Sequence, residues 1–133
     1  MPPASRARLA APLAVLALLA APLLAQERPK VPILPDHWTK AELNGFRGTP
    51  SYDETLAFLR RLEKTSPYLS LSFYGTSGEG RPMPLLVASK DKAFTPEAAA
   101  KAGKPVVLVL NGIHSGEIDG KDACLILLRD MAL

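Results

Sequence analysis

The clearest periodic pattern in the chain predicts an α-helix over residues 52–64. The apolar side chains of this segment share one helix face, because they recur at spacings of four and three: Tyr52, Leu56, Leu59 and Leu62. Ser51 and Glu54, three residues apart, form the capping-box pattern that opens a helix. The Ser66-Pro67 pair then stops it, since the residue before a proline is disfavoured in helical geometry.

Other patterns predict β-strands. Residues 69–74 alternate apolar and polar side chains, which is typical of a half-buried strand, and the glycine-rich residues 75–80 form a turn before a short second strand at residues 85–88. Residues 106–110 (VVLVL) are an unbroken apolar run. Such a run between breakers favours a central strand that is covered on both faces.

Two more helices complete the predicted order. Thr95, Pro96 and the following acid have the pattern of a helix start, and Gly103 the pattern of its end. Residues 123–133 are apolar almost all round, which predicts a buried helix. The order helix, strand, strand, helix, strand, helix predicts an α/β sandwich: a mixed, mostly parallel sheet flanked by helices, incomplete in this chain.

The first part of the chain predicts export. Residues 9–25 contain only Leu, Ala, Val and Pro and follow Arg6 and Arg8, which is the pattern of a signal peptide. We expect cleavage after Ala25 and a secreted or periplasmic protein; the alternative is an uncleaved anchor, although the run is shorter than a typical membrane span. Three segments follow from this: a signal peptide at 1–25, a proline-spotted extended lead-in at 26–50, and a domain from 51 to 133.

Composition narrows the classes of partner. The apolar share of 47% and the charged share of 22% are ordinary for a globular protein. The chain has 16 basic and 13 acidic residues. Removal of the signal peptide takes away two arginines and leaves a net charge of 14 − 13 = +1. We therefore expect no nucleic-acid binding, and no stable membrane association after cleavage. Cys124 is the single cysteine, so no internal disulfide or thiolate cluster is available.

The candidate chemistry lies at the end of the predicted central strand. His114 and Glu117 follow it directly, with glycines at 112, 116 and 120 between and around them. Ligands of open α/β sheets gather beyond the carboxyl ends of strands. Imidazole and carboxylate groups both suit Zn²⁺. His-x-x-Glu alone is a weak signal, and a surface hydrogen bond would account for the residue types equally well.

Three blocks, in order, resemble the zinc carboxypeptidases related to carboxypeptidase A. They are the helix at 52–64 with its following strand, residues 74–89 (YGTSGEGRPMPLLVAS), and residues 111–117 (NGIHSGE). Together they cover about residues 51–133. We therefore expect the N-terminal part of such an enzyme, with its sandwich fold.

The resemblance implies roles for particular residues. His114 and Glu117 are implied to be two zinc ligands, with a second histidine, a glutamate general base and a carboxylate-binding arginine expected beyond Leu133. Arg81, in the second block, is expected to shape its loop. The implied activity is hydrolysis of C-terminal peptide bonds by a zinc metallocarboxypeptidase, with this chain alone inactive.

One departure from the pattern leaves the substrate open. Digestive members of the family carry an arginine two residues after the first ligand histidine, and here that position is Gly116. Two alternatives therefore stand beside a carboxypeptidase acting on peptides with free C-termini. One is a zinc amidohydrolase of the same fold acting on cell-wall peptides or acyl amino acids, and the other is a non-catalytic secreted binding module.

Overall fold

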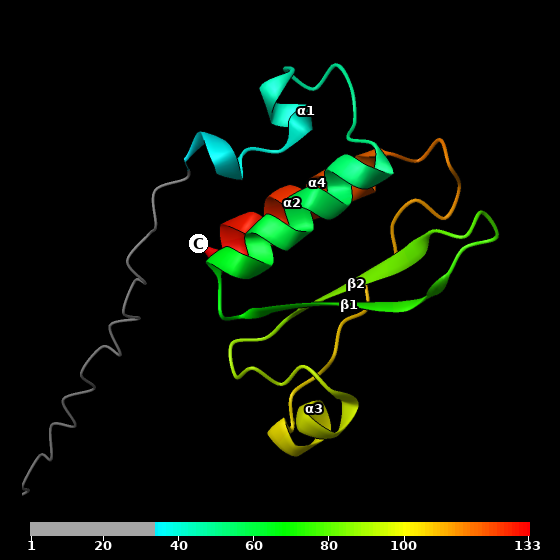
Figure 1. Ribbon diagram of the computed structural model, residues 1–133. Helices are drawn as coiled ribbons and strands as arrows, with labels where there is room; N and C mark the ends of the chain where they lie inside the picture. Colours follow the sequence, from blue (N-terminus) through cyan, green and yellow to red (C-terminus); the bar gives the residue numbers. More distant parts are fainter. Residues whose placement is uncertain (1–33) are drawn as a thin grey trace, which may run out of the picture.

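The computed structural model describes residues 34–133, so the predicted signal peptide and residues 26–33 of the lead-in lie outside the described residues. The described part contains helices and one small sheet (Figure 1). In chain order the elements are η1 (Pro35–His37), α1 (Lys40–Leu43), α2 (Tyr52–Thr65), β1 (Leu69–Thr76), β2 (Pro82–Ala88), α3 (Pro96–Ala102) and α4 (Asp119–Ala132). Among the described helices, none is long and apolar enough to cross a membrane.

Helix α2 confirms the strongest sequence prediction. The Ser51 hydroxyl accepts from the backbone N–H of Glu54, whose carboxylate accepts from the Ser51 N–H at 2.8 Å, and this is the predicted capping box. Lys40 donates a hydrogen bond to Glu54, and this bond, followed by the bond from the Ser51 backbone, lowers the pKa of Glu54 to about 2. The start of α2 is therefore fixed by local bonds.

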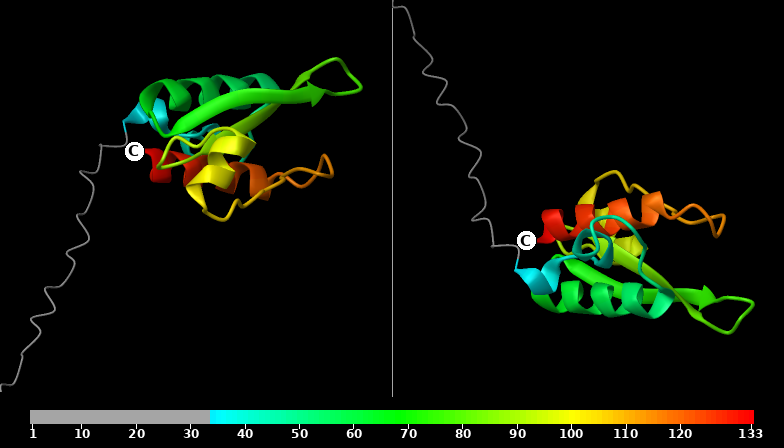
Figure 2. Two further views of the ribbon diagram at one scale, coloured as in Figure 1. Left: turned by 90° about the horizontal axis from the view of Figure 1, so that it is seen from below. Right: turned by 90° about the horizontal axis from the view of Figure 1, so that it is seen from above.

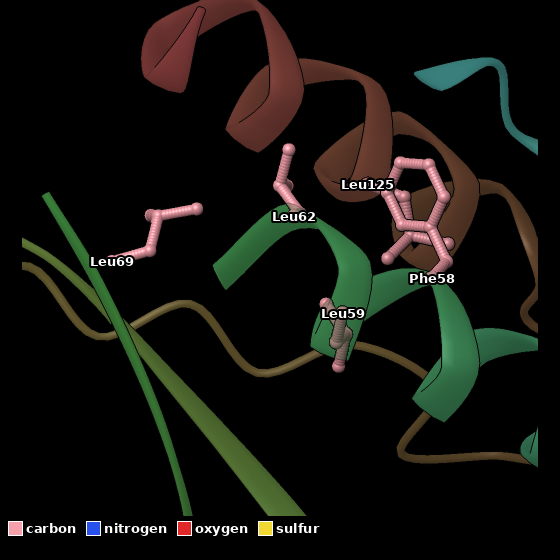
Figure 3. Packing of buried hydrophobic residues seen from close by; sticks show 5 residues of the cluster. All are labelled: Phe58, Leu59, Leu62, Leu69 and Leu125. Carbon is pink, nitrogen blue, oxygen red and sulfur yellow. The ribbon is translucent and has the colours of Figure 1, made fainter. Parts of the chain in front are cut away.

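The core lies where α2, β1 and α4 meet. Its buried members are Phe58, Leu59, Leu62, Leu69 and Leu125 (Figure 3). Helices α2 and α4 run side by side, with Leu125 of α4 lying against Phe58 (Figures 2 and 3). This small cluster joins Leu125 of α4, near the C-terminus, to residues of α2 and β1 that lie more than 50 residues earlier in the chain.

Strands β1 and β2 form an antiparallel hairpin. Leu69 pairs with Ala88 and Phe73 with Pro84, and one extra residue, Tyr74, makes a bulge before the pairing resumes at Gly75 and Met83. Because only a short turn joins them, the two strands must be antiparallel; a parallel pair needs a crossover connection of a dozen residues or more. The prediction of a mostly parallel sheet is therefore wrong for the described residues, whose sheet is two-stranded and antiparallel.

The predicted central strand at residues 106–110 is also wrong in the described residues. No ladder includes it, and its side chains are between 59% and 81% exposed. An apolar run becomes a strand only when another strand satisfies its backbone groups, and sequence pattern alone does not supply that partner. What remains of the fold prediction is a mixed helix and strand architecture, consistent with an incomplete α/β fold.

The lead-in is more structured than the expected extended segment. Pro35 opens η1, where its fixed backbone angle is favourable, and Thr39 and Glu42 form a second capping box around α1. Burial by itself raises the pKa of Glu42, but hydrogen bonds from Arg129 and from the Thr39 backbone and hydroxyl outweigh it and hold that pKa below its ordinary value. These bonds dock the lead-in on α4.

Helix α4 begins earlier and is more exposed than predicted. It starts at Asp119, four residues before the predicted start at Ala123. Leu125 is buried, whereas Leu127 and Met131 are exposed. The charged side chain of Arg129, also in α4, is buried. The predicted helix is confirmed, but its burial on all sides is not found.

Candidate metal centre

His114 and Glu117 lie together in the loop that leads into α4. The His114 Nδ1 is 2.7 Å from the Glu117 Oε1, which is hydrogen-bond distance. The backbone supports this approach, because the Glu117 N–H donates to the His114 carbonyl at 3.0 Å and closes a turn between them. The local sequence therefore places an imidazole and a carboxylate face to face.

Glycines allow the loop to take this shape. Gly112 has φ +66°, a left-handed conformation that residues with a Cβ rarely adopt. Gly120, in the first turn of α4, comes close to the side chain of Asn111: a Cβ built on Gly120 would lie 2.7 Å from the Asn111 Oδ1. The two ends of the loop are thus in contact around His114 and Glu117.

The donor set suits zinc. Neutral imidazole nitrogen and carboxylate oxygen are both ordinary Zn²⁺ ligands, and two ligands of one tetrahedral zinc ion lie about 3.3 Å apart. The observed separation of 2.7 Å is close enough that small side-chain rotations would let both atoms contact one ion. Both side chains are open to solvent, with exposed fractions of 78% and 62%, so an ion can reach them.

The described residues supply only part of a catalytic zinc shell. Residues 34–133 contain no group of three His, Cys, Asp or Glu side chains that could hold a metal ion. His37 is the other histidine of the chain. It lies in η1, where its backbone carbonyl accepts a hydrogen bond from Arg129 of α4. The two predicted ligands are therefore brought together, and a third is not found beside them.

Arg81 has the contacts of a loop-shaping residue. Its guanidinium lies 5.7 Å from the centre of the Tyr52 ring and 3.3 Å from the Glu79 carboxylate. The Tyr52 hydroxyl in turn donates to the Pro82 carbonyl at 2.6 Å. These contacts connect the hairpin to the first turn of α2. None of them involves His114 or Glu117.

Two long-range supports of α4 were not predicted from the sequence. Thr49 and Pro50 hydrogen-bond to side chains of the first turn of α4, 73 and 71 residues away. No spacing pattern connects residues so far apart, so nothing in the single sequence could have indicated these contacts. They hold the helix that directly follows residues 111–118, the loop with His114 and Glu117 (the metal loop).

A cavity of about 420 Å³ lies where the lead-in, α2 and α4 come together. Trp38, Phe58 and Arg61 are among its lining residues, together with parts of the lead-in and α4. Neither His114 nor Glu117 lines it. The cavity is therefore not part of the candidate metal centre.

A family model described as zinc carboxypeptidase matches residues 55–133. The matched region includes most of α2, the hairpin, α3, the loop with His114 and Glu117, and α4. No significant match is found among curated proteins or among solved structures.

Proposed function

The chain belongs to the zinc carboxypeptidase family, and from this premise we propose that it contributes to a zinc metallocarboxypeptidase that hydrolyses C-terminal peptide bonds. The family supports a zinc-dependent hydrolase of the peptidase type in general. The observation that carries the finer proposal is the approach of His114 Nδ1 to Glu117 Oε1, at 2.7 Å inside the matched region.

In this proposal His114 and Glu117 hold one side of the zinc ion. As metal ligands, an imidazole and a carboxylate would together bring one negative charge against the two positive charges of the ion, so the centre would keep net positive charge. Bound zinc polarises a substrate carbonyl and makes a water molecule more acidic. A third ligand, a general base and a carboxylate-binding arginine belong to the proposal through the family resemblance.

We further propose that the 133-residue chain is inactive by itself. Catalytic zinc sites normally use three protein ligands and a water molecule, and the described residues bring two candidate ligands together. Incubation of the chain with zinc and a panel of peptides with free C-termini should release no C-terminal residue. Release at a rate proportional to the bound zinc would overturn this part of the proposal.

The ligand roles are tested by zinc binding to the chain and its variants. His114→Ala and Glu117→Ala should each weaken zinc affinity at least about tenfold, because loss of even an outer-shell partner of a metal ligand costs about that much. Glu79→Ala is the matched control, because Glu79 is also an exposed loop carboxylate, paired with Arg81 at 3.3 Å. Equal zinc affinity in all three variants would mean that His114 and Glu117 are not ligands.

A second candidate is kept because of Gly116. This position lies between the two proposed ligands and has no side chain to hold a substrate carboxylate, unlike the arginine of the digestive members. A zinc amidohydrolase acting on cell-wall peptides or acyl amino acids is therefore the alternative activity. Zinc-dependent cleavage of acyl amino acids without cleavage of ordinary peptides would favour it. A non-catalytic binding module is disfavoured by the paired His114 and Glu117.

We also propose that the protein acts outside the cytoplasm, as a secreted or periplasmic protein. The support is the basic start and apolar run of residues 1–25. N-terminal sequencing of the mature protein should find a start near Gln26. A soluble protein that retains Met1 would contradict the proposal.

A further inference from the structure

The first turn of α4 directly follows the metal loop and has no side-chain cap. Helix α4 begins at Asp119, two residues after Glu117, and its N-cap residue is Ile118, which makes no side-chain cap hydrogen bond. The first N–H groups of a helix have no partner within it, so an uncapped first turn opens easily. Opening of this turn would move the backbone next to Glu117.

Two hydrogen bonds from a distant segment hold this turn. The Thr49 hydroxyl donates to the Asp122 Oδ1 at 2.9 Å, and the Lys121 Nζ donates to the Pro50 carbonyl at 2.6 Å. The Lys121 and Asp122 side chains are both largely buried. Bonds to charged groups that are partly shielded from water are stronger than neutral surface bonds. Neither bond caps a backbone N–H group, but both tie the first turn of α4 to the segment before α2.

The segment that supplies these bonds is itself fixed. Pro50 is buried, and Ser51, the next residue, is the N-cap of α2 with a complete capping box. Helix α2 is in turn packed into the core through Phe58, Leu59 and Leu62. The rigid start of α2 is thus connected directly to the first turn of α4.

We propose that Thr49 and Lys121 are positioning residues for the Glu117 carboxylate, acting through the first turn of α4. This inference rests on the proposed role of Glu117 as a zinc ligand. Neither residue contacts the ion in this scheme. Their effect is to keep Glu117 facing His114, so that little ordering is left to occur when zinc binds.

The test compares two threonines whose hydroxyls both donate a hydrogen bond, one to α4 and the other within α2. Thr49→Val removes the bond to Asp122 and keeps the shape of the side chain. Thr65→Val is the matched control, because the Thr65 hydroxyl donates at 2.9 Å to the Arg61 carbonyl within α2. Thr49→Ser keeps the hydroxyl and should behave as the unaltered chain.

Two measurements on the full chain are needed. Hydrogen exchange at the Asp122 amide, which donates to the Ile118 carbonyl at 3.2 Å, should become about fivefold faster in Thr49→Val only. Zinc affinity should fall by a similar factor, about fivefold, while exchange in the middle of α2 stays unchanged. A change in overall stability alone would alter the hydrogen-exchange rates of α2 and α4 together.

The outcomes separate this inference from the proposed function. If Thr49→Val exchanges and binds zinc as the control does, while His114→Ala and Glu117→Ala lose zinc, the positioning role is wrong and the ligand roles stand. If faster exchange at Asp122 leaves zinc affinity unchanged, the positioning role is also wrong. If His114→Ala and Glu117→Ala themselves keep zinc, the proposed ligand roles are wrong, and the positioning role, which rests on them, is wrong as well.

Discussion

Replacing Arg129 by methionine should cost the protein much of its stability. The Arg129 side chain is only 4% exposed, and its guanidinium donates to the Glu42 carboxylate at 2.6 Å, to the Asp130 carboxylate at 2.8 Å and to the His37 carbonyl at 3.3 Å. Burial lowers the pKa of Arg129, but the hydrogen bonds that it donates to Glu42 and Asp130 outweigh this and raise that pKa above its ordinary value. The guanidinium therefore stays charged and depends on these partners.

The magnitude follows from what the substitution leaves behind. Asp130 is about half exposed, so water can replace its lost partner at little cost. Glu42 is only 20% exposed, and it would keep its bonds from Thr39 but lose its countercharge. Removing one partner of a buried ion pair costs about 3 to 5 kcal/mol, and the remaining bonds of Glu42 place Arg129→Met near about 3 kcal/mol.

A double-mutant cycle with Glu42→Met isolates the pair. Glu42→Met leaves the guanidinium with the half-exposed Asp130 as its charged partner and removes the Glu42 side chain from the capping box of α1, so we expect about 4 kcal/mol. The double variant leaves no uncompensated charge and should be at least about 2 kcal/mol less destabilised than the sum of the single variants. Urea unfolding followed by circular dichroism gives these free energies. Fluorescence of Trp38, the single tryptophan, reports the lead-in separately.

Two results would refute the reasoning. Arg129→Met within about 0.5 kcal/mol of the unaltered chain would mean that water reaches Glu42 freely. Single effects that simply add in the double variant would mean that Arg129 and Glu42 do not act as a pair. In either case the lead-in would not be docked on α4 by this contact.

Three further outcomes are expected. Leu62 lies in the core and is 2% exposed, so Leu62→Ala should lower the free energy of unfolding in urea by about 3 kcal/mol. Leu127 is 55% exposed, so Leu127→Ala should change that free energy by less than about 1 kcal/mol. Because the pKa of Glu42 is held below its ordinary value of 4.5, the contribution of Glu42 to stability is complete above pH 4.5 and is lost as the pH falls further. Acid titration followed by tryptophan fluorescence should show this loss, and Glu42→Gln should flatten the curve. Gly103→Ala should cost about 1 kcal/mol in thermal unfolding, because Gly103 has φ +63°, while Gly78→Ala, at an unstrained and open position, should cost less.

The parts of the fold that the sequence predicted well are those with local causes. The capping box of Ser51 and Glu54, the apolar face of α2 and the left-handed Gly103 that ends α3 all depend on residues within a few positions of one another. The same is true of the hairpin. Residues 106–110 are different, because whether an apolar run becomes a strand depends on a partner that its own residues do not specify.

The candidate site divides in the same way. His114 and Glu117 are three residues apart, so glycines and one turn are enough to bring them together. The supports of Thr49 and Pro50 on α4 span more than 70 residues and follow only from the packing of α2 against α4. Arg129 is a similar case, since its buried role depends on where the lead-in docks and not on its neighbours in the helix.

The placement of the core has a consequence for the order of folding. The hairpin pairs residues that are close in the chain, so its loop closes quickly, within about 1 to 10 μs. Leu125 reaches Phe58 and Leu62 only after a long stretch of chain is closed, which is entropically costly and slow. We expect the hairpin to form before α4 docks, so the metal loop would take its final shape late in folding. Leu125→Ala should then mainly accelerate unfolding and leave the folding rate almost unchanged.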